Sequence, residues 1–150
     1  MQASLKIAKM SEEQNLARFV NAQEGVYTIA LNEIKRGRKT SHWMWYIFPQ
    51  IRGLGYSDTA IKFAIKSKSE ATEYLQHPVL GNRLVEISSA LLNLATNNAV
   101  EIFGHVDSLK LKSCMTLFSL LENTNPVFQK VLDKFFKGEK DSNTIALINP

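Results

Sequence analysis

The sequence predicts an all-α fold, a single compact domain of about six to eight helices, several of them short. Apolar residues recur at three- and four-residue steps through most of the chain, and residues that favour helix N-termini precede several of these stretches. Patterns typical of strands are few. The length of 150 residues fits one domain over residues 1–150, with residues 1–17 as a candidate for a loosely attached N-terminal segment.

The first predicted helix covers residues 17–36. Its apolar stripe consists of Phe19, Ala22, Val26, either Ile29 or Ala30, and Ile34. Gly37 follows as a C-terminal cap, and the basic residues of the last turn, Lys35 and Arg36, suit the negative end of the helix dipole.

A short apolar element with the sequence HWMWYIF is predicted next, over residues 42–48. Thr40 or Ser41 is expected to cap it, and the element should end at residue 48 because Pro49 disfavours helical geometry there. The segment is apolar on all sides, so the pattern predicts burial without distinguishing a helix from a strand.

Six further helices are predicted after a turn over residues 51–57. In this turn Gly53 and Gly55 allow positive φ or close approach of the backbone to another group. The expected N-terminal signals are Ser57, a Ser67–Glu70 capping box, Pro78, Asp107, Pro126 and Asp141. The corresponding helices cover residues 58–65, 68–76, 78–95, 108–122, 127–137 and 143–149. Residues 99–106 are interpreted as a short apolar connection, which contains the best strand candidate, EIFGHV.

Positive charge is concentrated in one part of the chain. The formal net charge is +4, whereas residues 35–68 contain eight cations and one anion, Asp58, which amounts to +7. The asymmetry predicts an anionic partner such as a phosphate, a nucleotide, a nucleic acid or an acidic protein, and the alternative is a solvated basic surface. The eight cations are Lys35, Arg36, Arg38, Lys39, Arg52, Lys62, Lys66 and Lys68.

The sequence carries no common metal or nucleophile motif. His42, His77 and His105 are far apart, and we expect no metal and no cofactor. Cys114 lies in an apolar run, which predicts a buried and unreactive thiol. No apolar run is long enough for a membrane span and no signal peptide is recognised, so the expected location is the cytoplasm, without a membrane partner.

Basic and aromatic residues around the apolar element form the predicted ligand site. Arg38 and Arg52 offer planar guanidinium groups suited to phosphate, and the helix that follows Ser57 would favour negative charge. An aromatic ring would stack on a base, although burial in the core is the alternative for the tryptophans. The candidate ligand-binding residues are Arg38, Lys39, His42, Trp43, Trp45, Gln50, Arg52, Gly53, Gly55, Tyr56, Arg83 and Lys110.

A polar stripe is predicted on the helix over residues 108–122. Asp107, Lys110, Ser113 and Thr116 recur at one-turn spacing and can share one helix face. The stripe would contribute to function only if it faced the segment that contains His42. The alternative is a helix cap with an ion pair one turn apart, which is worth about 0.2–0.5 kcal/mol.

Four blocks of the chain resemble the signature blocks of the family catalogued as domain of unknown function 1810. They are GRKTSHWMWYIFPQIRGLGYS, EATEYLQHPVLGNRL, IFGHVDSLKLKSCMTLFSLL and VLDKFFKGEKDSNTIALI, in the family's order, and the likeness runs from about Arg18 to Ile148. The resemblance implies a small, mainly helical bacterial domain and no established activity. Some members carry the label calpastatin, which a compact, core-rich sequence does not support.

Three functions remain open at this point. The leading hypothesis is a domain that binds an anionic, nucleotide-like or phosphate-bearing ligand. The second is a hydrolase or glycosidase of ADP-ribose or nucleotide conjugates, in which His42 or Asp107 would be the general acid or base. It also rests on the EIFG-x-x-D stretch, which is similar to the NADAR group of ADP-ribose enzymes. The third is an interaction module that binds a protein or, less favoured, a nucleic acid through a basic face.

Overall fold

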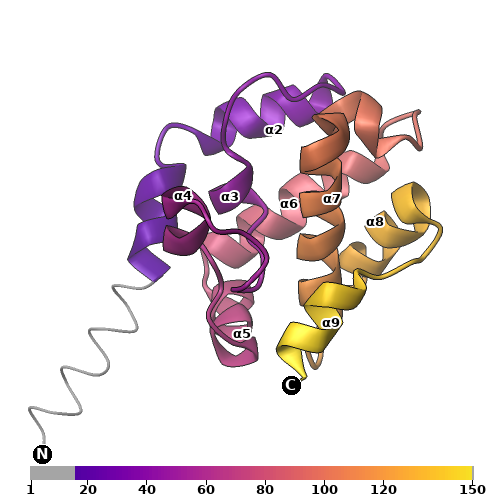
Figure 1. The fold of residues 1–150 in the computed structure, drawn as a ribbon. Coiled ribbons are helices and arrows are strands. Elements are labelled where there is room, and N and C mark those ends of the chain that lie inside the picture. The colour runs from indigo at the N-terminus through magenta and orange to yellow at the C-terminus, as the bar shows by residue number, and fades with distance from the viewer. Residues whose placement is uncertain (1–15, 150) are drawn as a thin grey trace, which may run out of the picture.

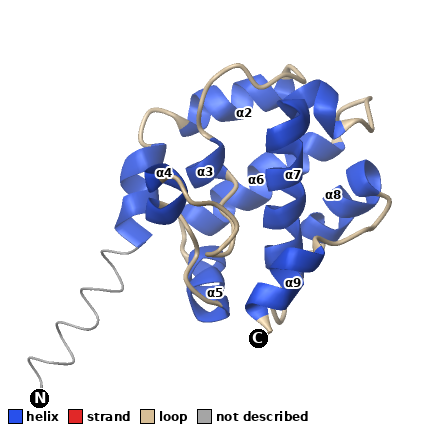
Figure 2. Ribbon diagram, viewed as in Figure 1, coloured by secondary structure: helices blue, strands red, loops and turns tan. Residues whose placement is uncertain are grey.

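The computed structural model describes residues 16–149, which form helices joined by short loops (Figures 1 and 2). Within these residues there are nine helices and no strand, and the all-α prediction is confirmed. Ile51 and Ile65 form an isolated parallel bridge between two loops. Most of the predicted N-terminal segment, residues 1–15, lies outside the described residues.

The longest helix, α7, runs through the middle of the fold. In Figure 1, α3 and α4 lie to one side of α7, α8 lies to the other, and α9 lies at the lower end of α7. α7 packs against α5, α8 and α9, and α6 packs against α2, α5 and α8. After a helix over residues 16–23, the elements are α2 (Tyr27–Lys35), α3 (Met44–Ile47), α4 (Asp58–Lys62), α5 (Lys68–Gln76), α6 (Leu80–Leu92), α7 (Ala99–Ser119), α8 (Val127–Phe136) and α9 (Ser142–Ile148).

The first predicted helix is divided into two. It ends at residue 23, and the chain turns over residues 24–26 before α2 begins. Of the two alternatives in the predicted stripe, Ala30 is fully buried, as is Ile34, whereas Ile29 is 50% exposed. Because one predicted helix is two in the structure, the described residues form nine helices, one more than the upper end of the predicted six to eight.

Three of the predicted N-caps are confirmed by side-chain hydrogen bonds from backbone N–H groups. Ser57 accepts from Ala60, Ser67 from Glu70 and Asp141 from Thr144. The predicted cap of α3 is wrong, because α3 follows Trp43 and has no side-chain cap bond. Thr40 and Ser41 lie farther back, in the loop between α2 and α3.

α7 corrects two predictions. The predicted connection over residues 99–106 is helical from Ala99 onward, because Asn98 caps it through a 3.0 Å hydrogen bond from the Val100 N–H. Gly104, with φ 80° and ψ 168°, is not helical and divides α7 into two helical segments across a kink. Asp107 lies in the first turn of the second segment, where its carboxylate pairs with Lys39 and Lys110 and does not act as the predicted cap.

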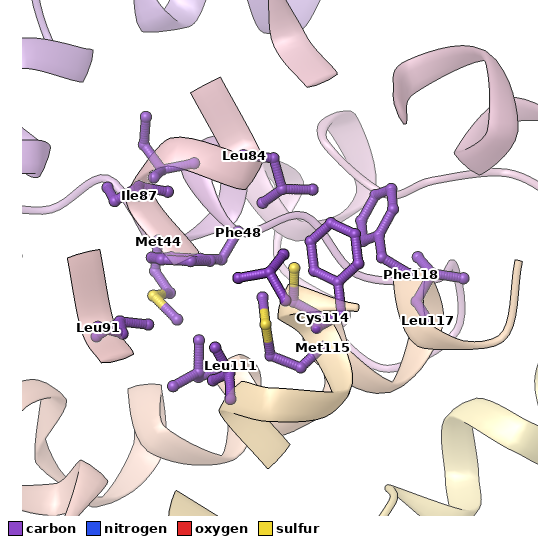
Figure 3. Close-up of a cluster of buried hydrophobic side chains, with 14 of the residues drawn as sticks. Met44, Phe48, Leu84, Ile87, Leu91, Leu111, Cys114, Met115, Leu117 and Phe118 are labelled. Carbon is purple, nitrogen blue, oxygen red and sulfur yellow. The ribbon is translucent and has the colours of Figure 1, made fainter. Parts of the chain in front are cut away.

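The core lies where α3, α6, α7 and α8 meet, and Figure 3 shows part of it. Cys114 is fully buried in this cluster, as predicted, and burial raises the pKa of its thiol. Apolar side chains therefore fix the position of α3. Labelled in Figure 3 are Met44, Phe48, Leu84, Ile87, Leu91, Leu111, Cys114, Met115, Leu117 and Phe118.

The variant Gly104→Ala tests whether the kink requires glycine. The φ and ψ of Gly104 belong to a region that other residues rarely adopt, and no heavy atom lies within 4 Å of an added Cβ. Backbone strain alone should therefore lower the free energy of unfolding, by about 1 kcal/mol in urea denaturation. The exposed neighbour His105 serves as the control, since His105→Ala should leave it nearly unchanged. A Gly104→Ala protein as stable as the parent would contradict the requirement.

Candidate functional site

A pocket of ≈ 380 Å³ opens between the α3 region, the start of α4 and the part of α7 that follows the kink. It brings together three segments that are distant in the sequence, and it joins the predicted polar stripe to the segment that contains His42. The pocket is lined by Lys39, His42, Trp43, Met44, Trp45, Tyr46, Ser57, Thr59, Asp107 and Lys110.

The charged centre of the pocket is a carboxylate shared by two lysines. The Lys39 Nζ lies 2.9 Å from the Asp107 Oδ2, and the Lys110 Nζ lies 3.0 Å from the Asp107 Oδ1. The three side chains are 8%, 19% and 21% exposed for Lys39, Asp107 and Lys110, so all three are largely shielded from water. With two ammonium groups and one carboxylate, this cluster carries one net positive charge.

Each lysine of the cluster also lies over an indole ring. The Lys39 Nζ is 5.0 Å from a Trp43 ring centroid, and the Lys110 Nζ is 4.3 Å from a Trp45 ring centroid. Both distances fall within the range of cation–π attraction. Trp43 is 1% exposed and belongs to the core, whereas Trp45 is half-buried at the pocket. The two predicted alternatives for the tryptophans, core and pocket, therefore apply to different rings.

Asp107 stays ionised at neutral pH. Burial acts to raise the pKa of its carboxyl group, but the hydrogen bonds and charges of Lys39 and Lys110 outweigh burial and lower it. A carboxylate of this kind does not donate a proton at neutral pH. It can hold the two ammonium groups in place and can accept hydrogen bonds from a ligand.

A second carboxylate, Glu33 of α2, fixes the loop that carries Lys39 and His42. Its Oε1 accepts hydrogen bonds from the backbone N–H groups of Thr40 and Ser41, at 2.7 and 2.9 Å. The same atom accepts from the indole N–H of Trp43 at 3.0 Å, and Oε2 accepts from the Ser41 hydroxyl at 2.6 Å.

The environment of Glu33 explains its acidity. Its side chain is buried, which acts to raise the pKa, but four hydrogen bonds to the carboxylate lower the pKa to about 2. Glu33 is therefore a positioning residue for the pocket, because it orders the loop and orients one indole. Sequence reasoning missed it. The available signal was the position of Glu33, which lies one turn from Ala30 on the apolar face of the predicted helix.

The other side of α3 is held by a buried amide. The Gln23 Nε2 donates to the Tyr46 carbonyl at 2.8 Å and to the Tyr74 hydroxyl at 3.1 Å. The Gln23 Oε1 accepts from the Arg83 Nη1 at 3.2 Å, and the Arg83 guanidinium lies over the Tyr27 ring. Arg83, a predicted ligand-binding residue, therefore supports α3 from outside the pocket.

The pocket contains five of the predicted ligand-binding residues, namely Lys39, His42, Trp43, Trp45 and Lys110, together with the catalytic candidate Asp107. His42 is exposed at the pocket surface. Sequence reasoning did not name three other lining residues, Met44, Tyr46 and Thr59, as ligand-binding groups. It included Ser57, which also lines the pocket, only as the start of a helix that would favour negative charge. Thr59 carries no signal of its own, because a threonine in the first turn of a short helix is common on solvated surfaces.

The remaining predicted residues lie outside this pocket lining. Arg38 is exposed in the loop after α2, and Gln50 is buried with no hydrogen-bond partner for its Nε2. Arg52 and Gly53 line a different hollow. Gly55 lies against the Trp45 ring, since an added Cβ would be 2.8 Å from the Trp45 Cη2.

Tyr56 and the second half of the polar stripe also lie outside the pocket lining. Tyr56 is 86% exposed and directly precedes Ser57 of the pocket. The lower half of the polar stripe turns to α9, where the Ser113 Oγ donates to the Asp141 Oδ2 at 3.0 Å and the Thr116 Oγ1 accepts from the Asp141 N–H at 2.9 Å. Of the predicted stripe, Asp107 and Lys110 therefore line the pocket, whereas Ser113 and Thr116 hold the start of α9 against α7.

Residues 16–149 contain no group of three or more histidine, cysteine, aspartate or glutamate side chains arranged to hold a metal ion. Among the helices of the same residues, none is long and apolar enough to cross a bilayer.

Comparison with known proteins identifies relatives without an assigned activity. The family model described as "Protein of unknown function (DUF1810)" matches residues 13–148. A solved structure, the conserved hypothetical protein Rv1873 from Mycobacterium tuberculosis, is 44% identical and superposes with a TM-score of 0.88. The match covers 91% of this chain and 97% of that one. A search of curated proteins finds no match. The family resemblance read from the sequence blocks is confirmed.

Proposed function

Because the chain belongs to the DUF1810 family, which is described only as of unknown function, we propose a function from the pocket itself. The domain binds a small anionic ligand that carries phosphate, and the ligand is nucleotide-like. The observation that carries the proposal is the cluster of Lys39, Asp107 and Lys110 in an aromatic-lined pocket. A core does not require three such charges, and the cluster retains one net positive charge.

The lysines keep hydrogen-bonding capacity for a ligand. An ammonium group has three N–H donors. Lys39 directs donors to Asp107 and, at 2.6 Å, to the Ser41 carbonyl, while Lys110 has its ion pair with Asp107. The other N–H groups can donate to phosphate oxygens, and the hydroxyl groups of Ser57 and Thr59 line the same pocket. Charge-assisted bonds of this kind are the strong ones in phosphate recognition.

Aromatic rings at the pocket support a planar group on the ligand. Lys110 lies over the half-buried Trp45, so an anion that attracts Lys110 would uncover part of that ring. Tyr56, which is 86% exposed beside the pocket, offers a second surface for stacking. Stacking of a base on an aromatic ring is worth about 1–3 kcal/mol and tolerates any base.

Tryptophan fluorescence tests the proposal directly. The chain has two tryptophans, and both line the pocket, where they lie beneath the two lysines. Titration with ATP, AMP, NAD, ADP-ribose and inorganic phosphate should change the emission with at least one of these compounds. No change with any of them at millimolar concentration would contradict the proposal.

The variant Lys110→Met should weaken this binding by about tenfold or more, since it removes a charged donor and preserves the aliphatic bulk. The matched control is Lys112→Met, because Lys112 lies on the same helix and pairs with Glu139 at 2.9 Å away from the pocket. The fluorescence titration measures both variants. Equal affinities for the two variants would place the ligand elsewhere.

A hydrolase or glycosidase is the second candidate, and one observation favours it. His42 and Asp107 line the same pocket, so a proton-carrying group and an ionised carboxylate could reach one substrate. In that case Asp107 would stabilise positive charge on a sugar ring and His42 would protonate the leaving group. Incubation with NAD, ADP-ribose and nucleotides, followed by chromatography, should then give products that His42→Gln abolishes. Recovery of every compound unchanged would contradict the enzyme.

A further inference from the structure

The positive charge of residues 35–68 is divided between different places in the fold. Lys39 lines the pocket described above, whereas Arg52, Lys66 and Lys68 line a second hollow of ≈ 450 Å³. This hollow lies between the loop after α3, the start of α5 and the end of α9. It is lined by Ile51, Arg52, Gly53, Lys66, Ser67, Lys68, Leu147 and Ile148.

Backbone hydrogen bonds hold two of these cations side by side. The N–H of Arg52 donates to the Ile65 carbonyl at 2.8 Å, and the N–H of Ile65 donates to the Gln50 carbonyl at 2.8 Å. These bonds form the parallel bridge between Ile51 and Ile65, which places Arg52 and Lys66 in neighbouring positions. The bridge therefore brings two basic residues to the same hollow.

No lining residue carries a carboxylate that balances Arg52 or Lys68. Within residues 16–149 the side chains of Arg52 and Lys68 have no hydrogen bond or ion pair, and both residues are exposed. The hollow thus presents the Arg52 guanidinium and the Lys68 ammonium group to solvent.

We propose that this hollow is a second binding site, separate from the pocket of Lys39 and Lys110, and that it takes a phosphate-bearing anion of the oligophosphate class. The planar guanidinium of Arg52 can bind one phosphate group with two parallel hydrogen bonds, and Lys68 supplies a point charge for the next group. The buried Ile51 beneath them excludes water from one side and strengthens these interactions. The proposal does not depend on the function proposed for the first pocket.

Isothermal titration calorimetry at low salt, with sodium triphosphate as the probe, tests this second site. The double variant Arg52→Gln/Lys68→Gln should bind triphosphate at least about tenfold more weakly than the parent, because it removes two of the charges that contact phosphate. The control double variant Arg36→Gln/Lys130→Gln removes the same charge at exposed positions outside the hollow and should stay within about twofold. Lys110→Met separates the two sites, since any triphosphate bound in the first pocket is weakened by this variant, whereas the binding component lost in Arg52→Gln/Lys68→Gln should remain.

The outcomes are distinct. Equal weakening in both double variants would show only non-specific attraction and would overturn the proposal, as would no binding by the parent at millimolar triphosphate. A short oligothymidylate distinguishes the source of the phosphate. Tighter binding of the oligonucleotide, lost in Arg52→Gln/Lys68→Gln, would identify a nucleic-acid backbone, and tighter binding of triphosphate would identify a free oligophosphate. Thermal unfolding serves as a folding check, since the variant should be about as stable as the parent.

Discussion

The substitution Glu33→Gln should lower the free energy of unfolding at pH 7 by about 3 kcal/mol. The carboxylate accepts four hydrogen bonds from the loop that follows α2, which include those from the Ser41 hydroxyl and the Trp43 indole. A glutamine has one acceptor oxygen, and its NH₂ group would face donors. The buried loop groups would then lose partners, and each loss costs about 1–3 kcal/mol before relaxation.

The pH dependence of unfolding gives the same interaction an independent measure. The pKa of Glu33 is lowered from an ordinary 4.5 to about 2 in the folded protein. The unfolded chain therefore binds more protons than the folded chain between these two values, so stability rises with pH there. The contribution of Glu33 is complete above about pH 4.5 and is lost as the pH falls towards 2.

Urea denaturation at pH 7, 5, 4 and 3 measures both effects. The parent should lose stability steeply below pH 5, and Glu33→Gln should be less stable at pH 7 with a shallower slope below pH 5. Glu24→Gln is the matched control, since Glu24 is an exposed carboxylate in the turn before α2, and it should change neither quantity by more than about 0.5 kcal/mol. Parallel pH curves for the parent and Glu33→Gln would contradict the role assigned to Glu33.

Much of the fold could be predicted because helix signals are local. The caps at Ser57, Ser67 and Asp141 depend on side chains three residues from the amides they bind, and the structure confirms all three. The predicted helix boundaries were wrong where the same local pattern fits either one long helix or two shorter helices. The stripe that begins at Phe19 continues in sequence across residues 24–26, and only tertiary packing shows that the chain turns there.

The candidate site could be predicted in part. Lys39, His42 and Trp45 lie close together in sequence, so their proximity could be predicted. Their proximity to Asp107 and Lys110 depends on the packing of the kinked α7 beside the α3 region, which sequence spacing does not encode.

Residues that hold the backbone of the site were missed by sequence reasoning. Glu33 and Gln23 lie on the buried faces of their helices, and their partners include backbone N–H groups and a carbonyl, which every residue possesses. Net charge also predicted only part of the arrangement. It indicated an excess of cations in residues 35–68, but the bridge between Ile51 and Ile65 determines that Arg52 and Lys66 lie at the same hollow.

Asp107→Asn should change stability and anion affinity in opposite directions. Asp107 is the shared partner of Lys39 and Lys110, and the Lys39 side chain is only 8% exposed. Removing the carboxylate leaves two ammonium groups close together without a counter-charge. Breaking a buried ion pair costs about 3–5 kcal/mol, and the partial exposure of Lys110 and Asp107 reduces this to about 2 kcal/mol.

The same substitution raises the charge of the pocket from one net positive charge to two. A phosphate-bearing ligand then replaces the missing carboxylate as the partner of both lysines, so its affinity should rise by about tenfold while unfolding becomes easier. Saturating ligand should restore part of the lost stability, because a ligand that binds only the folded state shifts unfolding by mass action. Urea denaturation without ligand and the tryptophan titration measure the two effects.

The direction of the affinity change discriminates between the roles of Asp107. If the carboxylate serves only as counter-ion to the lysines, Asp107→Asn binds phosphate-bearing ligands more tightly than the parent. If Asp107 instead accepts hydrogen bonds from the ligand or stabilises charge on a substrate, the variant binds more weakly or loses turnover. Lys110→Met provides the opposite charge change at the same cluster, so the counter-ion role requires the affinities to fall in the order Asp107→Asn, parent, Lys110→Met. Binding by Lys110→Met as tight as by the parent would overturn the assignment of the cluster as the anion-binding centre.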